Sequence, residues 1–127
     1  MDDKKFVTSI NCMDGRVQIP IIKWMKEKYK ADFVDIITEA GPNKILSEQK
    51  PDSIVQSIRK RVEISVKVHA SKVIAVSGHF DCAGNPTDKE TQKMQIKDSV
   101  EAIKSWGFNV QVIGLWIDNR WIVHEIV

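Results

Sequence analysis

Three side chains of the kinds that bind transition metals occur in two short segments of the sequence. Cys12 lies in the first segment, and His79 and Cys82 lie in the second with two residues between them. Two thiolates and one imidazole suit zinc, and three protein ligands leave a fourth tetrahedral position open, as in catalytic zinc sites. The sequence therefore predicts one zinc ion bound by Cys12, His79 and Cys82. A pair of buried structural thiols is the alternative for the two cysteines.

An acid and a guanidinium, Asp14 and Arg16, follow Cys12 closely. An arginine–carboxylate pair is often bidentate and keeps the carboxylate ionised and oriented. Because two thiolates cancel the charge of zinc, its bound water should acidify less readily than water on a zinc held by three histidines, where the pKa is about 7. We expect a site that favours alkaline pH, in which Asp14, held by Arg16, accepts the proton of zinc-bound hydroxide. Gly15 is expected to allow a tight turn, and a loop-stabilising salt bridge is the alternative role for the pair.

The other candidates for chemistry fit structural roles better. Asp81, inside the second segment, is expected to cap the loop or face solvent rather than bind metal. His69 ends a predicted helix, where a cation favours the helix dipole, and His124 lies in the last predicted strand. Phe80 either lines a pocket or packs, and the four tryptophans are expected in the core or at an interface.

Two other thiol chemistries do not match the spacing. A phosphatase loop needs a longer separation than the three residues between Cys12 and Arg16, and Asp14 would repel phosphate. A redox dithiol of the usual kind needs a Cys-x-x-Cys pair, which the sequence lacks. Metal binding remains the interpretation that uses all of these residues.

Strand and helix signals alternate along the chain. The apolar run at 73–76 is typical of a central parallel strand buried on both faces, and Thr87 and Glu90 have the spacing of a capping box. The order predicts an α/β fold, with a single domain over residues 1–127 and a mainly parallel sheet flanked by helices, ending in an antiparallel strand. The predicted strands span 5–10, 32–37, 72–77, 109–115 and 121–126, the helices 20–29, 52–69 and 87–106, and the loops include 40–43 and 78–86.

Both chemical segments follow predicted strands. Cys12 follows the first strand, and His79 and Cys82 follow the third. In open α/β sheets, ligands bind beyond the carboxyl ends of the strands, where the strand order reverses. If the first and third strands are neighbours at such a switch point, the three side chains converge despite their separation in sequence.

Composition limits the partners and the location. The net charge of +2 over 127 residues is too small to indicate nucleic acid. The charged start of the chain is not a signal peptide, and no stretch approaches the ~20 apolar residues that span a bilayer. We therefore expect a cytoplasmic protein without nucleic-acid or membrane partners. In that compartment, cysteines are metal-binding, catalytic or buried thiols more often than disulfides.

The pattern Cys-x-Asp-x-Arg at 12–16, followed by His-x-x-Cys at 79–82, resembles the β-class carbonic anhydrase family. The strand before His79, the Ala40-Gly41 turn and the final hairpin are also similar to that family. The resemblance covers most of residues 5–127, and the two motifs are specific because both occur in the right order after a strand.

The resemblance implies a zinc lyase that interconverts carbon dioxide and bicarbonate. It implies Cys12, His79 and Cys82 as zinc ligands and Asp14 with Arg16 as the catalytic dyad. It also implies a homodimer or a higher homo-oligomer. In some members of the family the aspartate itself closes onto zinc and inactivates the enzyme, so Asp14 has two possible partners, the metal and Arg16.

Several positions depart from the family pattern. Phe80 stands where serine or threonine is common, Ala83 where glycine is common, and Thr38 and Glu39 where arginine and asparagine are common. These changes affect the pocket and the interface more than the metal ligands. Two other functions therefore stay open: hydrolysis of carbonyl sulfide or carbon disulfide by the same ligand set, and a non-catalytic zinc-binding protein of the same fold.

Overall fold

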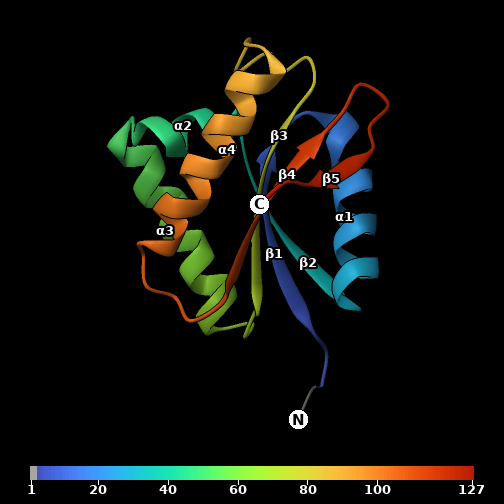
Figure 1. Cartoon of the computed structure of the whole chain (residues 1–127). Helices are drawn as coiled ribbons and strands as arrows, with labels where there is room; N and C mark the ends of the chain where they lie inside the picture. The colour runs from blue at the N-terminus through green and yellow to red at the C-terminus, as the bar shows by residue number, and fades with distance from the viewer. Residues whose placement is uncertain (1–2) are drawn as a thin grey trace.

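The computed structural model describes residues 3–127 as one sheet with helices on both sides (Figure 1). The strand order is β2-β1-β3-β4-β5, and only β5 runs antiparallel to its neighbour. The predicted α/β fold with a mainly parallel sheet is therefore confirmed. The elements are β1 (Phe6–Cys12), α1 (Gly15–Tyr29), β2 (Phe33–Glu39), α2 (Pro42–Glu48), α3 (Asp52–Lys67), β3 (Val73–His79), α4 (Lys89–Lys104), β4 (Gln111–Ile117) and β5 (Val123–Glu125).

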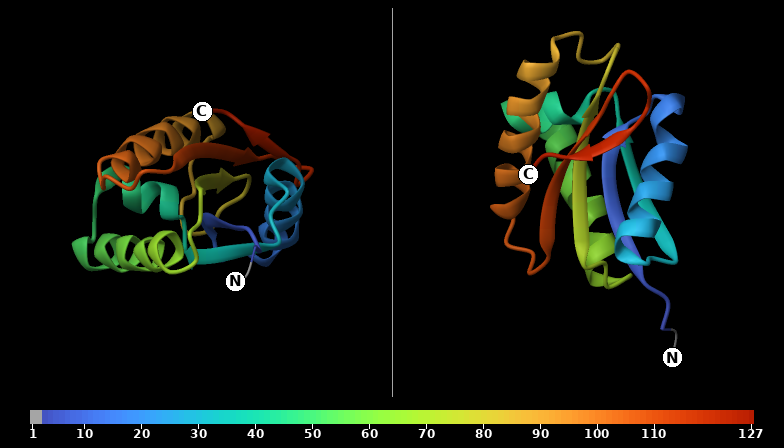
Figure 2. Two further views of the ribbon diagram at one scale, coloured as in Figure 1. Left: turned by 90° about the horizontal axis from the view of Figure 1, so that it is seen from below. Right: turned by 45° about the vertical axis from the view of Figure 1, so that its right-hand side comes forward.

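Helix α1 covers one face of the sheet, and α2, α3 and α4 cover the other (Figures 1 and 2). Strand β3 is buried on both faces. Successive side chains of a strand point to opposite sides, and each side of this strand is covered by a core. Val73 and Ala75 pack in the core beneath α1, whereas Ile74 and Val76 pack in the core beneath the other three helices. The apolar run at 73–76 is thus a central strand, as predicted. Among the helices of residues 3–127, none has the length and apolarity needed to cross a bilayer.

Helix α1 begins five residues earlier than predicted, at Gly15 rather than Pro20. The reason is an N-cap, because the Asp14 side chain accepts a hydrogen bond from the backbone N–H of Arg16. Pro20 consequently lies inside the helix. The expectation of a tight turn at Gly15 was wrong, since Gly15 is the first helical residue and does not have a positive φ.

Other boundaries also differ from the predictions. Residues 40–43 do not form a loop throughout, because Gly41 adopts a left-handed conformation (φ +65°) and Pro42 starts α2. Helix α4 is capped by Asp88, which accepts from the N–H of Thr91 at 2.6 Å, rather than by Thr87. Strand β3 also extends through His79, because it keeps its pairing with β4 up to that residue.

Strand β1 lies between β2 and β3 and pairs in parallel with both. The strand order therefore reverses at β1 and β3, which is the kind of switch point where α/β folds bind ligands. Cys12 is the last residue of β1 and His79 is the last residue of β3. Both side chains consequently reach the same edge of the sheet, as the sequence predicted.

Gly78 allows two amide side chains to approach the strand directly before His79. A Cβ at this position would lie 2.5 Å from Gln92 Oε1 and 2.7 Å from Asn43 Nδ2. Both amides are buried and bonded to each other, so they cannot move aside without losing hydrogen bonds. The missing side chain is therefore a packing requirement of the sheet edge that carries the site.

We predict that Gly78→Ala destabilises the protein by about 1–3 kcal/mol, because the added methyl group overpacks a filled core. Gly15→Ala is the matched control: a Cβ there has no neighbour within 4 Å, so this variant should be neutral or stabilised by up to about 1 kcal/mol. Urea unfolding of the two variants measures both effects. Equal midpoints for Gly78→Ala and the parent protein would contradict the packing argument.

Candidate metal centre

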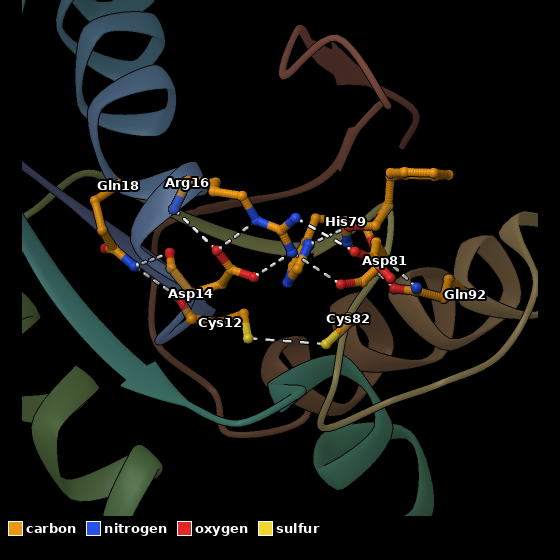
Figure 3. Close-up of polar contacts among 9 residues, drawn as sticks. Cys12, Asp14, Arg16, Gln18, His79, Asp81, Cys82 and Gln92 are labelled. Atoms are coloured by element: carbon orange, nitrogen blue, oxygen red, sulfur yellow. Dashed lines mark hydrogen bonds and ion pairs between the residues drawn. The ribbon is translucent and has the colours of Figure 1, made fainter.

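Three buried ligand atoms converge at the carboxyl ends of β1 and β3 (Figure 3). The ligand atoms of Cys12, His79 and Cys82 all lie within 4.8 Å of one another, and the two Sγ atoms are 3.8 Å apart. Two sulfurs bound tetrahedrally to zinc at about 2.3 Å are themselves separated by about 3.8 Å. The spacing of the thiols therefore fits a tetrahedral metal ion.

The ring of His79 is oriented for metal binding. Its Nδ1 lies 2.7 Å from the carbonyl oxygen of Phe80, which can only accept, so Nδ1 carries the hydrogen. In the neutral ring, Nε2 then keeps its lone pair, and this buried atom has no hydrogen-bond partner. Fixing the tautomer through the other ring nitrogen is typical of metal-binding histidines. The unpartnered Nε2 is an independent indication that the residues fit a metal.

The two thiols and the imidazole influence one another's protonation. The hydrogen bond with Cys82 lowers the pKa of Cys12 to about 4, and the same contact raises the pKa of Cys82. Burial lowers the pKa of His79, but the neighbouring Cys12 sulfur and the Phe80 carbonyl outweigh burial, so the net shift is upward. The first thiol proton is therefore the easier of the two to remove, and binding a cation would release the second as well, while His79 keeps the hydrogen on Nδ1.

Asp14 and Arg16 form a bidentate pair beside Cys12 (Figure 3). Asp14 Oδ2 is 2.7 Å from Arg16 Nη2, and Asp14 Oδ1 is 3.0 Å from Arg16 Nε. These bonds from Arg16 are the main cause that lowers the pKa of Asp14 to about 2. Of the two possible partners of Asp14, the structure shows Arg16, and Asp14 is not part of the three-residue ligand group.

Arg16 also links the first segment to the second. Its Nη2 donates to the carbonyl oxygen of Asp81 at 3.0 Å, and its Nη1 lies 3.3 Å from the Asp81 carboxylate. Asp81 adopts a positive φ of 58°. Its carboxylate is exposed but is not merely solvent-facing, because it binds Arg16. Nothing in the sequence indicates this contact, because Arg16 and Asp81 are 65 positions apart.

Amide side chains hold the backbone of two of the ligands, Cys12 and His79. Gln92 Nε2 donates to the carbonyl oxygen of His79 at 2.8 Å, and Gln92 Oε1 accepts from the N–H of His79 at 3.2 Å. Gln18 Nε2 donates to the carbonyl oxygens of Cys12 and Asp14, both at 2.8 Å. Neither glutamine belongs to a recognisable sequence motif, so these roles could not be predicted from the sequence.

A sequence profile of the family described as "Putative carbonic anhydrase" matches residues 2–127. The chain belongs to this carbonic anhydrase family. The resemblance inferred from the two motifs is thereby confirmed. No curated protein sequence matches the chain significantly.

Solved structures share the fold of this carbonic anhydrase family member at low sequence identity. One of two tetrameric β-carbonic anhydrases from Sordaria macrospora has a TM-score of 0.62 at 14% identity, covering 99% of this chain and 82% of that chain. The β-carbonic anhydrase CafA of Aspergillus fumigatus has a TM-score of 0.58 at 14% identity, with coverages of 97% and 75%. A mutant of CafD from the same fungus has a TM-score of 0.60 at 12% identity, with coverages of 99% and 91%. These similarities establish the β-carbonic anhydrase fold.

The remaining candidate residues of this carbonic anhydrase family member lie outside the ligand group. His69 Nδ1 pairs with Asp35 at 2.6 Å, and His124 Nε2 pairs with Asp118 at 2.7 Å. Phe80 is 47% exposed and lines a cavity of about 820 Å³ that also touches Cys82. Phe80 thus lines a pocket rather than packing in the core.

We predict that Gln92→Leu weakens both stability and zinc affinity. The substitution leaves the buried N–H and C=O of His79 without a side-chain partner, at a cost on the order of 1–3 kcal/mol for each orphaned group. Urea unfolding of the metal-free protein and competition with a chromophoric zinc chelator provide the two measurements. Gln56→Leu is the control, because Gln56 is exposed and bonds Asp52 on the surface of α3. The support role is disproved if the two variants behave alike.

Proposed function

We propose that this chain is a zinc-dependent carbonic anhydrase that catalyses the reversible hydration of carbon dioxide to bicarbonate. The observation that carries the proposal is the combination of three buried, convergent ligands with an ionised Asp14–Arg16 pair at the same edge of the sheet. Membership of the carbonic anhydrase family supports the same reaction. Residues 1–127 are proposed to act as one zinc domain.

Cys12, His79 and Cys82 are proposed to hold zinc and to leave one tetrahedral position for a small ligand. When bound, zinc would supply a Lewis acid that acidifies a coordinated water, although less strongly than a zinc held by three histidines does. Because the three ligands are buried and amide side chains hold the backbone of Cys12 and His79, the protein fixes much of the geometry of the site before substrate arrives.

Asp14 is proposed to orient the attacking water. An ionised carboxylate can only accept hydrogen bonds, so Asp14 would accept one from the O–H of the nucleophile and leave an oxygen lone pair directed at carbon dioxide. Arg16 fixes the carboxylate through two bonds and keeps it ionised. Asp14 also caps α1, so its backbone is anchored by a helix.

We further propose that the chain acts in the cytoplasm as a homodimer or a higher homo-oligomer. Cys12 and Cys82 are free thiols, which suits a reducing compartment. Two apolar side chains are exposed near the start of α1, Met13 by 65% and Ile19 by 78%. The Sordaria macrospora neighbours are tetrameric, and sedimentation velocity would test whether this chain assembles.

We predict that the purified parent protein binds about one zinc per chain and hydrates carbon dioxide faster at higher pH. Cys82→Ser should lose both metal and rate, because a ligand is gone. Asp14→Ala should keep its zinc and lose rate by roughly 10²-fold, the typical effect of losing a group that orients a reactant. Metal analysis and stopped-flow hydration measure these outcomes.

Asp88→Ala is the matched control for Asp14→Ala. Both aspartates cap helices, so both variants should lose about 1 kcal/mol of stability, whereas only Asp14→Ala should lose activity. A zinc-loaded parent without hydration above buffer between pH 7 and pH 9 would exclude carbon dioxide as substrate. Parallel assays with carbonyl sulfide and carbon disulfide then separate a hydrolase from a non-catalytic zinc protein.

A further inference from the structure

Trp121 adopts a backbone conformation that bulky residues rarely use. Its φ is +62°, in the left-handed region that favours glycine. The chain between β4 and β5 imposes this conformation, because Asp118 Oδ1 accepts from the backbone N–H groups of Arg120 at 2.8 Å and Ile122 at 3.0 Å. The N–H of Trp121 donates to the carbonyl oxygen of Asp118. Residues held in strained backbone conformations cluster at functional sites, so the conformation of Trp121 points to a role for its side chain.

The indole ring of Trp121 contacts both halves of the candidate site. The turn that carries it lies beside the N-terminal end of α1 (Figures 1 and 2). Arg16 Cζ stands 4.5 Å from the centre of the ring, within the range of a cation–π contact. The ring of His79 is 6.3 Å away and tilted by 46°. One side chain from the end of the chain thus adjoins the dyad and a metal ligand.

The contact with Arg16 complements the hydrogen bonds that this guanidinium makes. Asp14 and Asp81 bind its N–H groups, which lie in the guanidinium plane. The Trp121 ring instead lies with its own face toward Arg16 Cζ, 4.5 Å from it. Because the Arg16 side chain is 45% exposed, the ring adds a restraint to those that the hydrogen bonds at its N–H groups supply.

We propose that Trp121 is a positioning residue that fixes the plane of Arg16 and, through it, the orientation of the Asp14 carboxylate. The effect on catalysis rests on the proposed carbonic anhydrase function, whereas the effect on Arg16 does not. Trp121 does not touch the reacting atoms in this proposal. It acts through the guanidinium, and the strained turn holds it in place.

The conformation of the turn provides a direct test. Glycine accepts a positive φ without strain, so Trp121→Gly removes the ring and relieves the backbone at once. Trp121→Asn is a second ring-free variant, since asparagine also visits this region. Trp121→Phe keeps an aromatic face. Trp24→Leu is the control, because Trp24 packs in the same core beneath α1 and contacts Tyr29.

The first measurement is the ¹⁵N-correlated NMR signal of the Arg16 Nε–H group, assigned with Arg16→Lys, in metal-free and zinc-loaded protein. We expect Trp121→Gly and Trp121→Asn to move this signal and to speed its hydrogen exchange by roughly 2- to 30-fold, the range of a cation–π contact. Trp121→Phe should stay close to the parent. A ring-free variant whose Arg16 signal shifts no more than that of Trp24→Leu overturns the proposal.

The second measurement is steady-state hydration at equal zinc content. The ring-free variants should lower kcat roughly 2- to 30-fold with little change in KM, and Trp121→Phe should restore most of the rate. An unchanged kcat together with a shifted Arg16 signal would overturn the link to Asp14. If the parent has no hydration activity, the proposed function fails, and the NMR comparison still decides whether Trp121 positions Arg16.

Discussion

The parallel pairing of β1 with β3 is the constraint on which the site depends. It brings Cys12 and His79 to the same edge of the sheet although they are 67 positions apart in the sequence. The two neighbouring strands are fully backed by cores on both faces, so their ends cannot drift relative to each other. A tetrahedral site needs its ligands placed within a fraction of an ångström, and strand ends meet that requirement better than free loops.

Arg16 is the second organising feature. The sheet places the segments after β1, β3 and β4 close together, and this one cation contacts all three. It binds Asp14 in the turn after β1, Asp81 in the turn after β3, and the ring of Trp121 after β4. Three strand ends are thereby connected through a single side chain. Lysine could not make these contacts together, because its ammonium lacks a planar fork and a face that stacks.

The features that could be predicted from the sequence are those that depend on residue type and on the spacing of apolar residues. Cys12, His79 and Cys82 are recognisable because few side chains bind zinc, and the apolar run at 73–76 is recognisable because only a central strand is buried on both faces. The early start of α1 was missed because the cap at Asp14 outweighs the helix-breaking tendency of Pro20. Gln92 and Trp121 were missed for a different reason. Their roles come from tertiary contacts, and the residue types glutamine and tryptophan do not indicate such contacts in a sequence.

The amides behind His79 have an electrostatic consequence. Gln92 holds the backbone of this ligand and bonds Asn43, which also contacts Gln95. None of these side chains gains or loses a proton, so the scaffold keeps the same hydrogen bonds in acid and in base. It also adds no net charge beside the two thiols and the imidazole. A change of pH therefore acts on the ligand side chains themselves and leaves the hydrogen bonds that hold the His79 backbone unchanged.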